Sequence, residues 1–134
     1  SSREGRWVGV RWSFRGRRLQ FDGGWLVIER VRGRTRPDAA DRRWEMRASR
    51  LVARVRPSGR VASWWARGDV RIVGPSPIYA VGDRAFSLRP GRSIGIAGDG
   101  SSPYLLGSGW NLAGRKIVIN IRQLRASAVG LGKH

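Results

Sequence analysis

The stretch LVARVRPSGRVASWWA, residues 51–66, decides the fold class. Apolar and polar side chains alternate on both sides of Pro57-Ser58-Gly59, and a period of two is typical of a half-buried β-strand. Proline suits the first position of a turn and glycine suits its left-handed third position. The stretch therefore predicts a β-hairpin with a three-residue loop.

Arg56 opposite Arg60 sets the predicted register of this hairpin. One face then collects mostly apolar side chains, namely Leu51, Ala53, Val55, Val61, Ser63 and Trp65. The other face collects Arg50, Val52, Arg54, Arg56, Arg60, Ala62, Trp64 and Ala66. Because parity decides the face of each side chain, this register predicts that Trp65 packs in the core and that Trp64 is exposed among four arginines.

The same alternation continues along the chain in both directions. Before the hairpin it predicts a strand over residues 8–14, a turn at 15–17 into a short return strand, a hairpin turn at 22–24 and a central strand over 25–31. After the hairpin it predicts strands over residues 69–73, 78–81, 85–88, 93–97 and 115–123. Many short strands separated by turns indicate a mainly β protein, a single antiparallel sandwich or barrel with short hairpins.

Residues 36–50 have a second interpretation. Thr35-Arg36-Pro37-Asp38 resembles the start of a helix, with a threonine cap, a proline in the first turn and an acid three residues after the cap. The composition that follows also favours a helix. One helix within residues 36–50 is therefore an alternative to a strand leading into the hairpin.

The chain of 134 residues has the length of one domain. We expect a single basic β domain over residues 1–125 and a mobile C-terminal tail over residues 126–134. No apolar run approaches the roughly 18–20 residues that a membrane-spanning helix requires.

The charge of the chain is its strongest functional signal. The sequence contains 27 lysines and arginines but nine aspartates and glutamates, which gives a net charge of +18. Solubility requires a net charge of only about 2–8 in a small domain, and the excess repels itself in the compact state. The cations are spread over the predicted strands, which indicates a basic face for an anionic partner rather than a basic tail.

The residues needed for most enzyme chemistry are missing from the sequence. There is no cysteine, and the single histidine, His134, is the last residue. Thiolate metal sites, cysteine nucleophiles and histidine-dependent triads are thereby excluded. Four of the nine acids are aspartates that adjoin a glycine, as is typical of turns, namely Asp22, Asp69, Asp83 and Asp99. We predict a non-enzymatic protein without a metal site or a cofactor.

Two glycine-rich segments are candidate binding loops. Residues 91–100 lack the strand–loop–helix order of a phosphate-binding loop, and they predict a strand edge with a turn. Residues 98–114 form a predicted long loop, which is either a binding loop or a surface connector with Tyr104 and Trp110 packed on the core.

Three kinds of anionic partner fit this charge. The leading hypothesis is sequence-nonspecific binding or packaging of nucleic acid, with phosphates on arginine and bases on an exposed tryptophan. The alternatives are an anionic membrane lipid surface or cell-envelope glycan, and an acidic protein partner or a homo-oligomer in an assembly. The candidate ligand-binding residues are Trp64, Arg50, Arg54, Arg56, Arg60, Arg11, Arg15, Arg17 and Arg18. A cation–π contact that covers Trp64 with Arg50 or Arg54 is the alternative role for these side chains.

Overall fold

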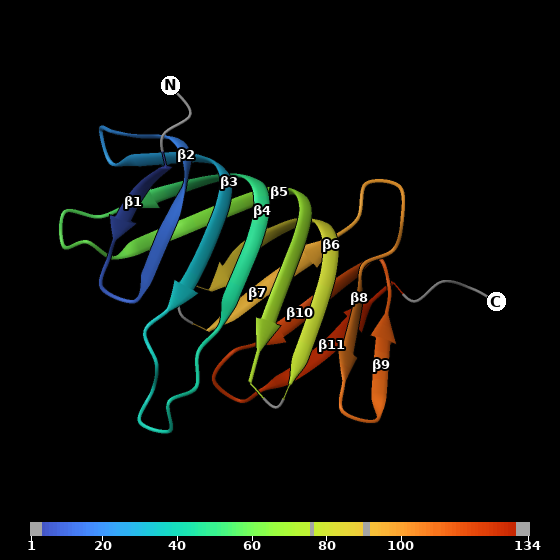
Figure 1. Cartoon of the computed structure of the whole chain (residues 1–134). Helices are drawn as coiled ribbons and strands as arrows, with labels where there is room; N and C mark the ends of the chain where they lie inside the picture. Colours follow the sequence, from blue (N-terminus) through green and yellow to red (C-terminus); the bar gives the residue numbers. More distant parts are fainter. Residues whose placement is uncertain (1–3, 76, 90–91, 131–134) are drawn as a thin grey trace.

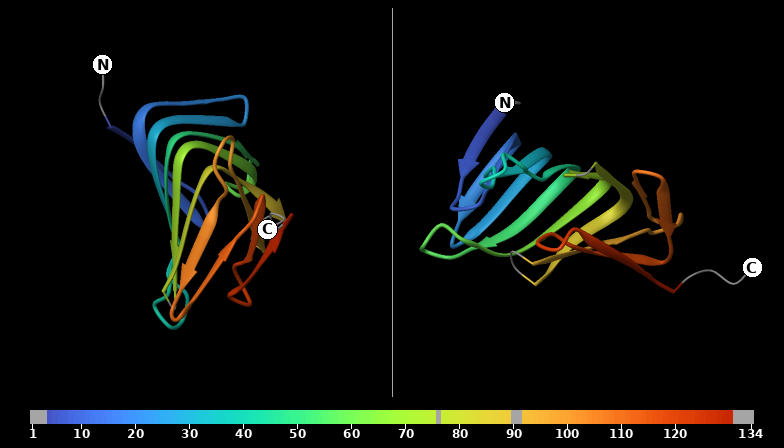
Figure 2. Two further views of the ribbon diagram at one scale, coloured as in Figure 1. Left: turned by 90° about the vertical axis from the view of Figure 1, so that its right-hand side faces the viewer. Right: turned by 90° about the horizontal axis from the view of Figure 1, so that it is seen from below.

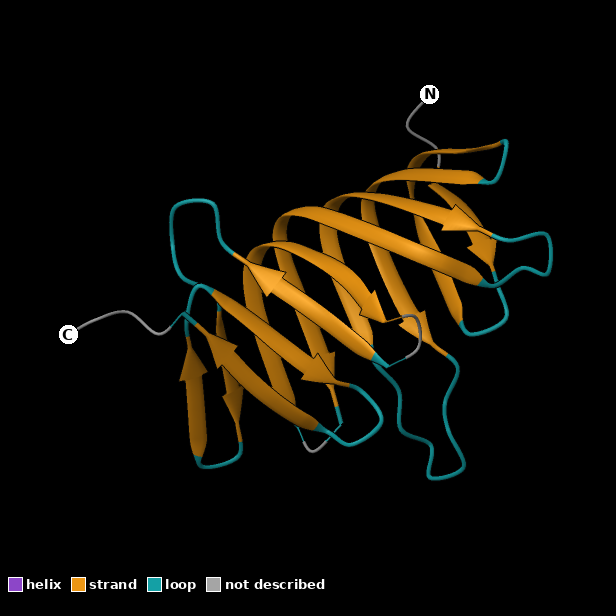
Figure 3. Cartoon of the chain, turned by 180° about the vertical axis from the view of Figure 1, so that it is seen from behind, coloured by secondary structure: helices purple, strands orange, loops and turns teal. Residues whose placement is uncertain are grey.

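The computed structural model describes residues 4–75, 77–89 and 92–130 of the chain, and these form strands, turns and loops (Figures 1 and 3). The strands are β1 (Glu4–Val8), β2 (Trp12–Asp22), β3 (Trp25–Thr35), β4 (Glu45–Val55), β5 (Val61–Gly74), β6 (Ile78–Arg89), β7 (Ser93–Ala97), β8 (Tyr104–Gly107), β9 (Trp110–Ala113), β10 (Lys116–Asn120) and β11 (Arg125–Val129). The described residues include no helix long and apolar enough to cross a membrane.

All strands belong to one antiparallel sheet. Its order is β1-β2-β3-β4-β5-β6-β7-β10-β11, and β8 branches from β6 and pairs with β9. The main path has two open ends, β1 and β11, so the sheet is not closed into a barrel. The predicted mainly β, antiparallel fold is confirmed, and its form is sandwich-like because the sheet folds over itself (Figure 2).

The sheet folds over itself along a line of bulges that crosses the five long strands, β2–β6. The pairing register shifts after Arg15 in β2, after Arg47 in β4 and after Arg67 in β5. Next to this line the backbone has a left-handed conformation, with positive φ, at Arg18, Arg30 and Asp69. Bulges bend a strand and increase its twist, so each of the strands β2–β6 gives one half to each of two layers.

We name the two layers for later use. Layer 1 contains β1, residues 12–15, 31–35, 45–47, 70–74 and 78–82, and the strands β8 and β9. Layer 2 contains residues 20–22, 25–29, 50–55, 61–67 and 84–89, and the strands β7, β10 and β11.

The core lies between the inner sides of the two layers. Its largest fully buried side chains include Phe14 and Met46 from layer 1 and Ile28, Leu51 and Ile117 from layer 2. All of them belong to one hydrophobic cluster. The outer sides of the two layers therefore face away from each other.

The hairpin over residues 51–66 forms as predicted, but its face assignment is wrong for the tryptophans. The N–H of Arg56 donates to the carbonyl of Arg60 at 2.8 Å, which confirms the predicted pairing at the turn. Val55 then pairs with Val61, whereas Arg54 pairs with Ser63, so one extra residue, Ala62, forms a bulge. A one-residue shift moves every later side chain to the opposite face.

The consequence is an exchange of roles between the two adjacent tryptophans. Trp64 pairs with Ala53 and is only 4% exposed, whereas Trp65 pairs with Val52 and is 47% exposed. The predicted exposure of Trp64 and burial of Trp65 are therefore both wrong. Trp7 on β1 is half-buried and packs against the core.

The predicted turns near the N-terminus are partly displaced. Residues 8–14 do not form one strand, because the chain turns after β1 and the N–H of Gly9 donates to the carbonyl of Trp12 at 2.9 Å. The chain does not turn at residues 15–17 but continues through them in β2 with a bend. Gly16 permits this bend, because a Cβ there would lie 2.6 Å from the carbonyl oxygen of Glu29. The predicted turn at 22–24 is confirmed, with positive φ at Gly23 and Gly24.

Residues 36–50 contain no helix. The segment is a loop that leads into β4, which begins at Glu45. The side chains that suggested a helix cap instead hold the loop, since Asp38 Oδ1 accepts from the N–H groups of Ala40 and Arg42 at 2.9 Å each. Thr35 Oγ1 likewise accepts from the N–H of Trp44 at 2.9 Å.

The later part of the chain contains more strand than was predicted. The predicted strands 78–81 and 85–88 are the two halves of β6, and the strand predicted over 93–97 is β7. The loop predicted over 98–114 contains the hairpin of β8 and β9, on which Tyr104 and Trp110 are exposed. Residues 126–129 of the predicted tail belong to β11, which pairs with β10, while residues 131–134 lie outside the described residues.

Candidate functional site

The nine candidate residues do not share one surface. Trp64 is in the core, Arg15 is on the outer side of layer 1, and Arg50 and Arg54 are on the outer side of layer 2. Arg17 and Arg18 are exposed at the bend of β2. The expectation of one basic face that contains all of them is wrong, because the bulges divide the strands between two opposed faces.

The remaining candidates lie at one end of the two layers. Arg11, Arg56 and Arg60, joined by Arg122, line a pocket of about 270 Å³ that also contacts Trp12 and Trp64. These four arginines come from the β1–β2 turn, the β4–β5 turn and the segment after β10. The buried Trp64 thus reaches this basic pocket, but not an open sheet surface.

An exposed pair of tryptophans lies on the outer side of layer 2. Trp25 in β3 and Trp65 in β5 stack with ring centroids 6.3 Å apart and an interplanar angle of 27°. Their exposed fractions are 45% and 47%. Trp65 pairs directly with Val52 and with Phe86, so it stands in an apolar row across β4, β5 and β6.

Arginines flank this apolar row on both sides. Arg54 pairs with Trp25 on one side of the row. On the other side Arg50 pairs with Arg67, which pairs in turn with Arg84. Directly opposed residues of antiparallel strands point to the same face. We call the set Trp25, Trp65, Phe86, Arg50, Arg54 and Arg67 the tryptophan face.

The cations on and next to the tryptophan face differ in the groups that they contact. Nε of Arg84 lies 2.7 Å from Oδ1 of Asp99, and the Lys116 ammonium lies 5.5 Å from the Phe86 ring centroid. Among the described residues, no carboxylate forms an ion pair with Arg50, Arg54 or Arg67. Glu29 lies directly opposite Arg50, but its carboxylate pairs with Arg18 at 3.3 Å. The three guanidinium groups can therefore bind an external anion.

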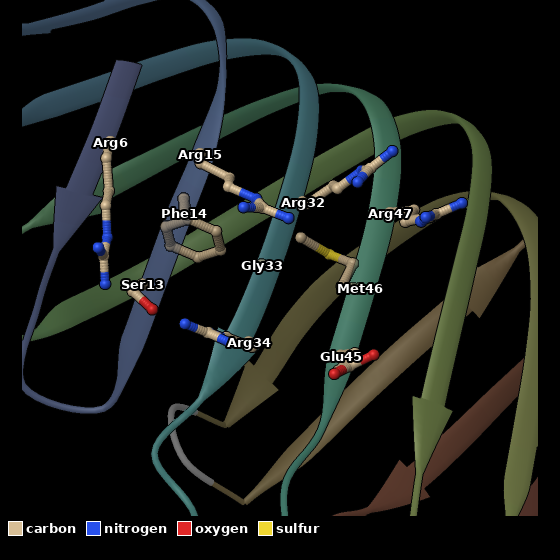
Figure 4. Close-up of a pocket in the computed structure, with 10 residues that line it drawn as sticks. All are labelled: Arg6, Ser13, Phe14, Arg15, Arg32, Gly33, Arg34, Glu45, Met46 and Arg47. Carbon is tan, nitrogen blue, oxygen red and sulfur yellow. The ribbon is translucent and has the colours of Figure 1, made fainter. Parts of the chain in front are cut away.

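A row of arginines crosses the outer side of layer 1. Five directly paired residues on five neighbouring strands are arginine, namely Arg6, Arg15, Arg32, Arg47 and Arg71. We call this row the arginine ladder. Figure 4 shows its first four members on β1–β4, around a shallow pocket of about 210 Å³ that Arg34 and Glu45 also line.

Few carboxylates neutralise the arginine ladder. Arg15 lies 3.6 Å from Glu4, and Arg71 lies 3.4 Å from Asp69. Arg71 also donates to the Tyr79 hydroxyl at 2.6 Å, and this hydrogen bond raises the pKa of Arg71. Arg6, Arg32 and Arg47 form no ion pair with the described residues. Like charges placed directly opposite each other are destabilising, so neighbouring arginines of the ladder repel one another in the free protein.

No known family model and no curated protein matches this chain.

The described residues show no cluster typical of a metal centre. No group of three or more histidine, cysteine, aspartate or glutamate residues lies close enough among them to hold a metal ion. Among the described residues, the pKa of the Asp38 carboxyl group is lowered, chiefly through the hydrogen bond from the Arg42 N–H. That hydrogen bond belongs to a loop and serves its structure.

The predicted site residues include only Arg50 and Arg54 of the tryptophan face and only Arg15 of the five ladder arginines. They do not include Trp25, Trp65, Phe86 and Arg67 of the tryptophan face. A signal for the ladder was present, because Arg32 and Arg34 alternate with Val31 and Gly33 in the second half of β3. Because the strand was predicted to end at residue 31, Arg32 and Arg34 were not placed on it. The cross-strand alignment of the ladder depends on five registers and has no local signature.

Proposed function

We propose that this chain is a non-enzymatic module that binds single-stranded nucleic acid, without sequence preference, on the tryptophan face. Bases stack on Trp25 and Trp65, and phosphates pair with Arg50, Arg54 and Arg67. Proteins of this functional class combine a positive surface that follows the backbone with aromatic side chains that accept any base.

The observation that carries the proposal is the half-exposed Trp25–Trp65 stack between arginines that form no ion pair with a carboxylate of the described residues. The alternative role for such a tryptophan is to be covered by a neighbouring cation. Among the described residues the cation–π contact joins Lys116 to Phe86, so no cation covers either indole ring of the stack. An uncovered aromatic platform with unpaired cations beside it fits a ligand that offers both rings and phosphates.

The test is binding to labelled oligothymidine of about 12 nucleotides, within the usual site sizes of such surfaces. Fluorescence anisotropy at several salt concentrations gives both the affinity and its salt dependence. Trp65→Ala should weaken binding about 5- to 150-fold, as expected for loss of one stacked base. It should leave the salt dependence unchanged, because stacking releases no counterions. Trp110→Ala is the matched control, since Trp110 on β9 is 45% exposed but lies outside the tryptophan face.

Arginine substitutions should have the complementary effect. Arg54→Ala combined with Arg67→Ala should flatten the slope of log affinity against log salt by about 1.4, or about 0.7 for each phosphate neutralised. Arg36→Ala with Arg115→Ala removes the same charge from exposed positions outside both faces. Equal effects of Trp65→Ala and Trp110→Ala, or a flat salt dependence, would contradict the proposal.

The other anionic partners are separate outcomes of the same experiment. Tighter binding to heparin or to phosphatidylserine vesicles than to oligothymidine would replace the proposal with a glycan or membrane surface. Absence of salt-dependent binding to all three probes would replace it with docking of an acidic protein.

A further inference from the structure

The arginine ladder and the tryptophan face lie on opposite sides of the molecule. The ladder is on the outer side of layer 1 and the tryptophan face is on the outer side of layer 2, with the shared core between them (Figure 2). One ligand that lies flat on either face does not reach the other. Each surface therefore needs its own occupant.

The ladder has the geometry of an extended anion site. Adjacent strands of a sheet are about 4.8 Å apart, so five paired arginines span about 19 Å across the strands. Three of them, Arg6, Arg32 and Arg47, have no ion-pair partner among the described residues. A single small anion neutralises only part of such a row, whereas a chain of phosphates neutralises all of it.

The rows beside the ladder indicate which phosphate chain fits. The neighbouring row across β1–β5 contains Val8, Ser13, Arg34, Glu45 and Val73. None of these residues carries an aromatic ring; the aromatic residues of this outer side, Tyr79 and Tyr104, lie beyond β5, opposite Val73 and Val81. The five strands of the ladder therefore offer no ring on which an unpaired base could stack. A duplex keeps its bases stacked inside and presents only its backbone, and contacts to that backbone are made chiefly by arginine and lysine.

We propose that the arginine ladder binds the sugar–phosphate backbone of a nucleic-acid duplex. One chain then bridges a duplex on layer 1 and a single strand on layer 2, a step that rests on the function proposed above for the tryptophan face. Duplex binding by the ladder does not depend on that function. The like-charge conflict between neighbouring ladder arginines is relieved when phosphates lie between them.

The first experiment measures duplex binding with the full chain. A labelled duplex of about 20 base pairs should bind with a slope of log affinity against log salt of about −0.9 for each phosphate neutralised. Arg32→Gln with Arg47→Gln should weaken duplex binding about tenfold or more and flatten that slope by about 1.8. Arg36→Gln with Arg115→Gln is the charge-matched control, and far-ultraviolet circular dichroism checks that all variants fold.

The second experiment measures bridging. A biotinylated duplex on a surface should capture the unmodified protein, which should then retain labelled oligothymidine. The ladder variant should lose this capture while its affinity for free oligothymidine stays within about twofold, because its tryptophan face is intact. Trp65→Ala should lose retained oligothymidine but keep duplex binding.

These outcomes separate the two proposals. If Trp65→Ala leaves oligothymidine binding unchanged, the proposed function fails while duplex binding by the ladder still stands. If the ladder variant and its charge-matched control bind the duplex equally, the ladder proposal is overturned. Loss of binding to phosphatidylserine vesicles with unchanged duplex binding would also overturn it, in favour of a membrane surface.

Discussion

Trp12 from layer 1 and Trp64 from layer 2 meet edge to face across the core, with ring centroids 6.1 Å apart. Trp12 also stacks on Phe14, whose ring centroid is 5.6 Å away, and Phe14 stacks on Trp7. Edge-to-face and offset-stacked aromatic pairs stabilise a fold beyond the area that they bury. This contact joins the two halves of the folded sheet directly.

Trp64→Ala should therefore destabilise the protein much more than Trp65→Ala. Loss of the buried indole opens a cavity and should cost about 3–5 kcal/mol. Trp65→Ala removes an exposed stack on Trp25 and should cost about 1 kcal/mol or less. Urea unfolding of the two variants compares the free energies of unfolding directly, and a larger loss for Trp65→Ala would mean that the bulge at Ala62 is misplaced.

Gly33→Ala should also be destabilising. Gly33 lies between Phe14 and Met46 in the core row, and an added Cβ would lie 2.7 Å from two atoms of the Phe14 ring. Overpacking of this kind typically costs about 1–3 kcal/mol. Gly100→Ala is the control, because nothing lies within 4 Å of a Cβ there. Thermal unfolding should show a lower midpoint for Gly33→Ala alone, and equal midpoints would contradict the packing of Phe14 on this glycine.

Substitution within the arginine ladder should raise stability. Arg32 is directly paired with both Arg15 and Arg47. Arg32→Thr relieves two like-charge contacts, each worth about 0.2–1 kcal/mol in a sheet. The gain should be present at low salt and small at about 1 M salt, where the Debye length is about 3 Å. Arg115→Thr, made at an exposed turn position, should show no comparable gain. A loss of stability on Arg32→Thr at low salt would show that repulsion between Arg32 and its paired arginines does not destabilise the sheet.

Asp38 should make the stability of its loop dependent on pH. Its pKa is lowered, first by the hydrogen bond from the Arg42 N–H, and a lowered pKa in the folded state favours the charged carboxylate. The stabilisation is thus fully present above the pKa of the unfolded chain, about 3.9, and is lost as the pH falls through the folded pKa.

The measurement compares Asp38→Asn with the unmodified protein between about pH 6 and pH 3. The difference between their thermal midpoints should shrink as the pH falls. Asp41→Asn is the matched control, because the hydrogen bond from Asp41 to Asp38 uses only backbone atoms. A difference that stays constant over this range would show that Asp38 acts without its charge.

Local turn chemistry allowed a good part of the fold to be predicted. The turns at Gly23-Gly24 and Pro57-Ser58-Gly59 depend on residues that tolerate or require particular backbone angles, and both are present. The role of Thr35 and Asp38 was misassigned for a related reason. Side-chain acceptors that cap a helix bind the N–H groups of a loop in the same way, so only tertiary structure distinguishes the two.

The candidate site was less predictable because it depends on bulges. The bulge at Ala62 exchanges Trp64 and Trp65, and no feature of two adjacent tryptophans indicates which one is buried. The bends in β2, β4 and β5 likewise separate Arg15 from Arg17 and Arg47 from Arg50. Each bulge depends on packing across strands that are distant in sequence, so alternation alone places the arginines on too few surfaces.

The line of bulges has a consequence for any attempt to dissect the molecule. Residues 25–29 belong to layer 2 and residues 31–35 to layer 1, and the chain alternates between the layers again at 45–47 and 50–55 and at 61–67 and 70–74. The two surfaces are therefore interleaved along the polypeptide. No truncated fragment or synthetic peptide carries one surface whole without strands of the other, and only point substitutions can separate their contributions.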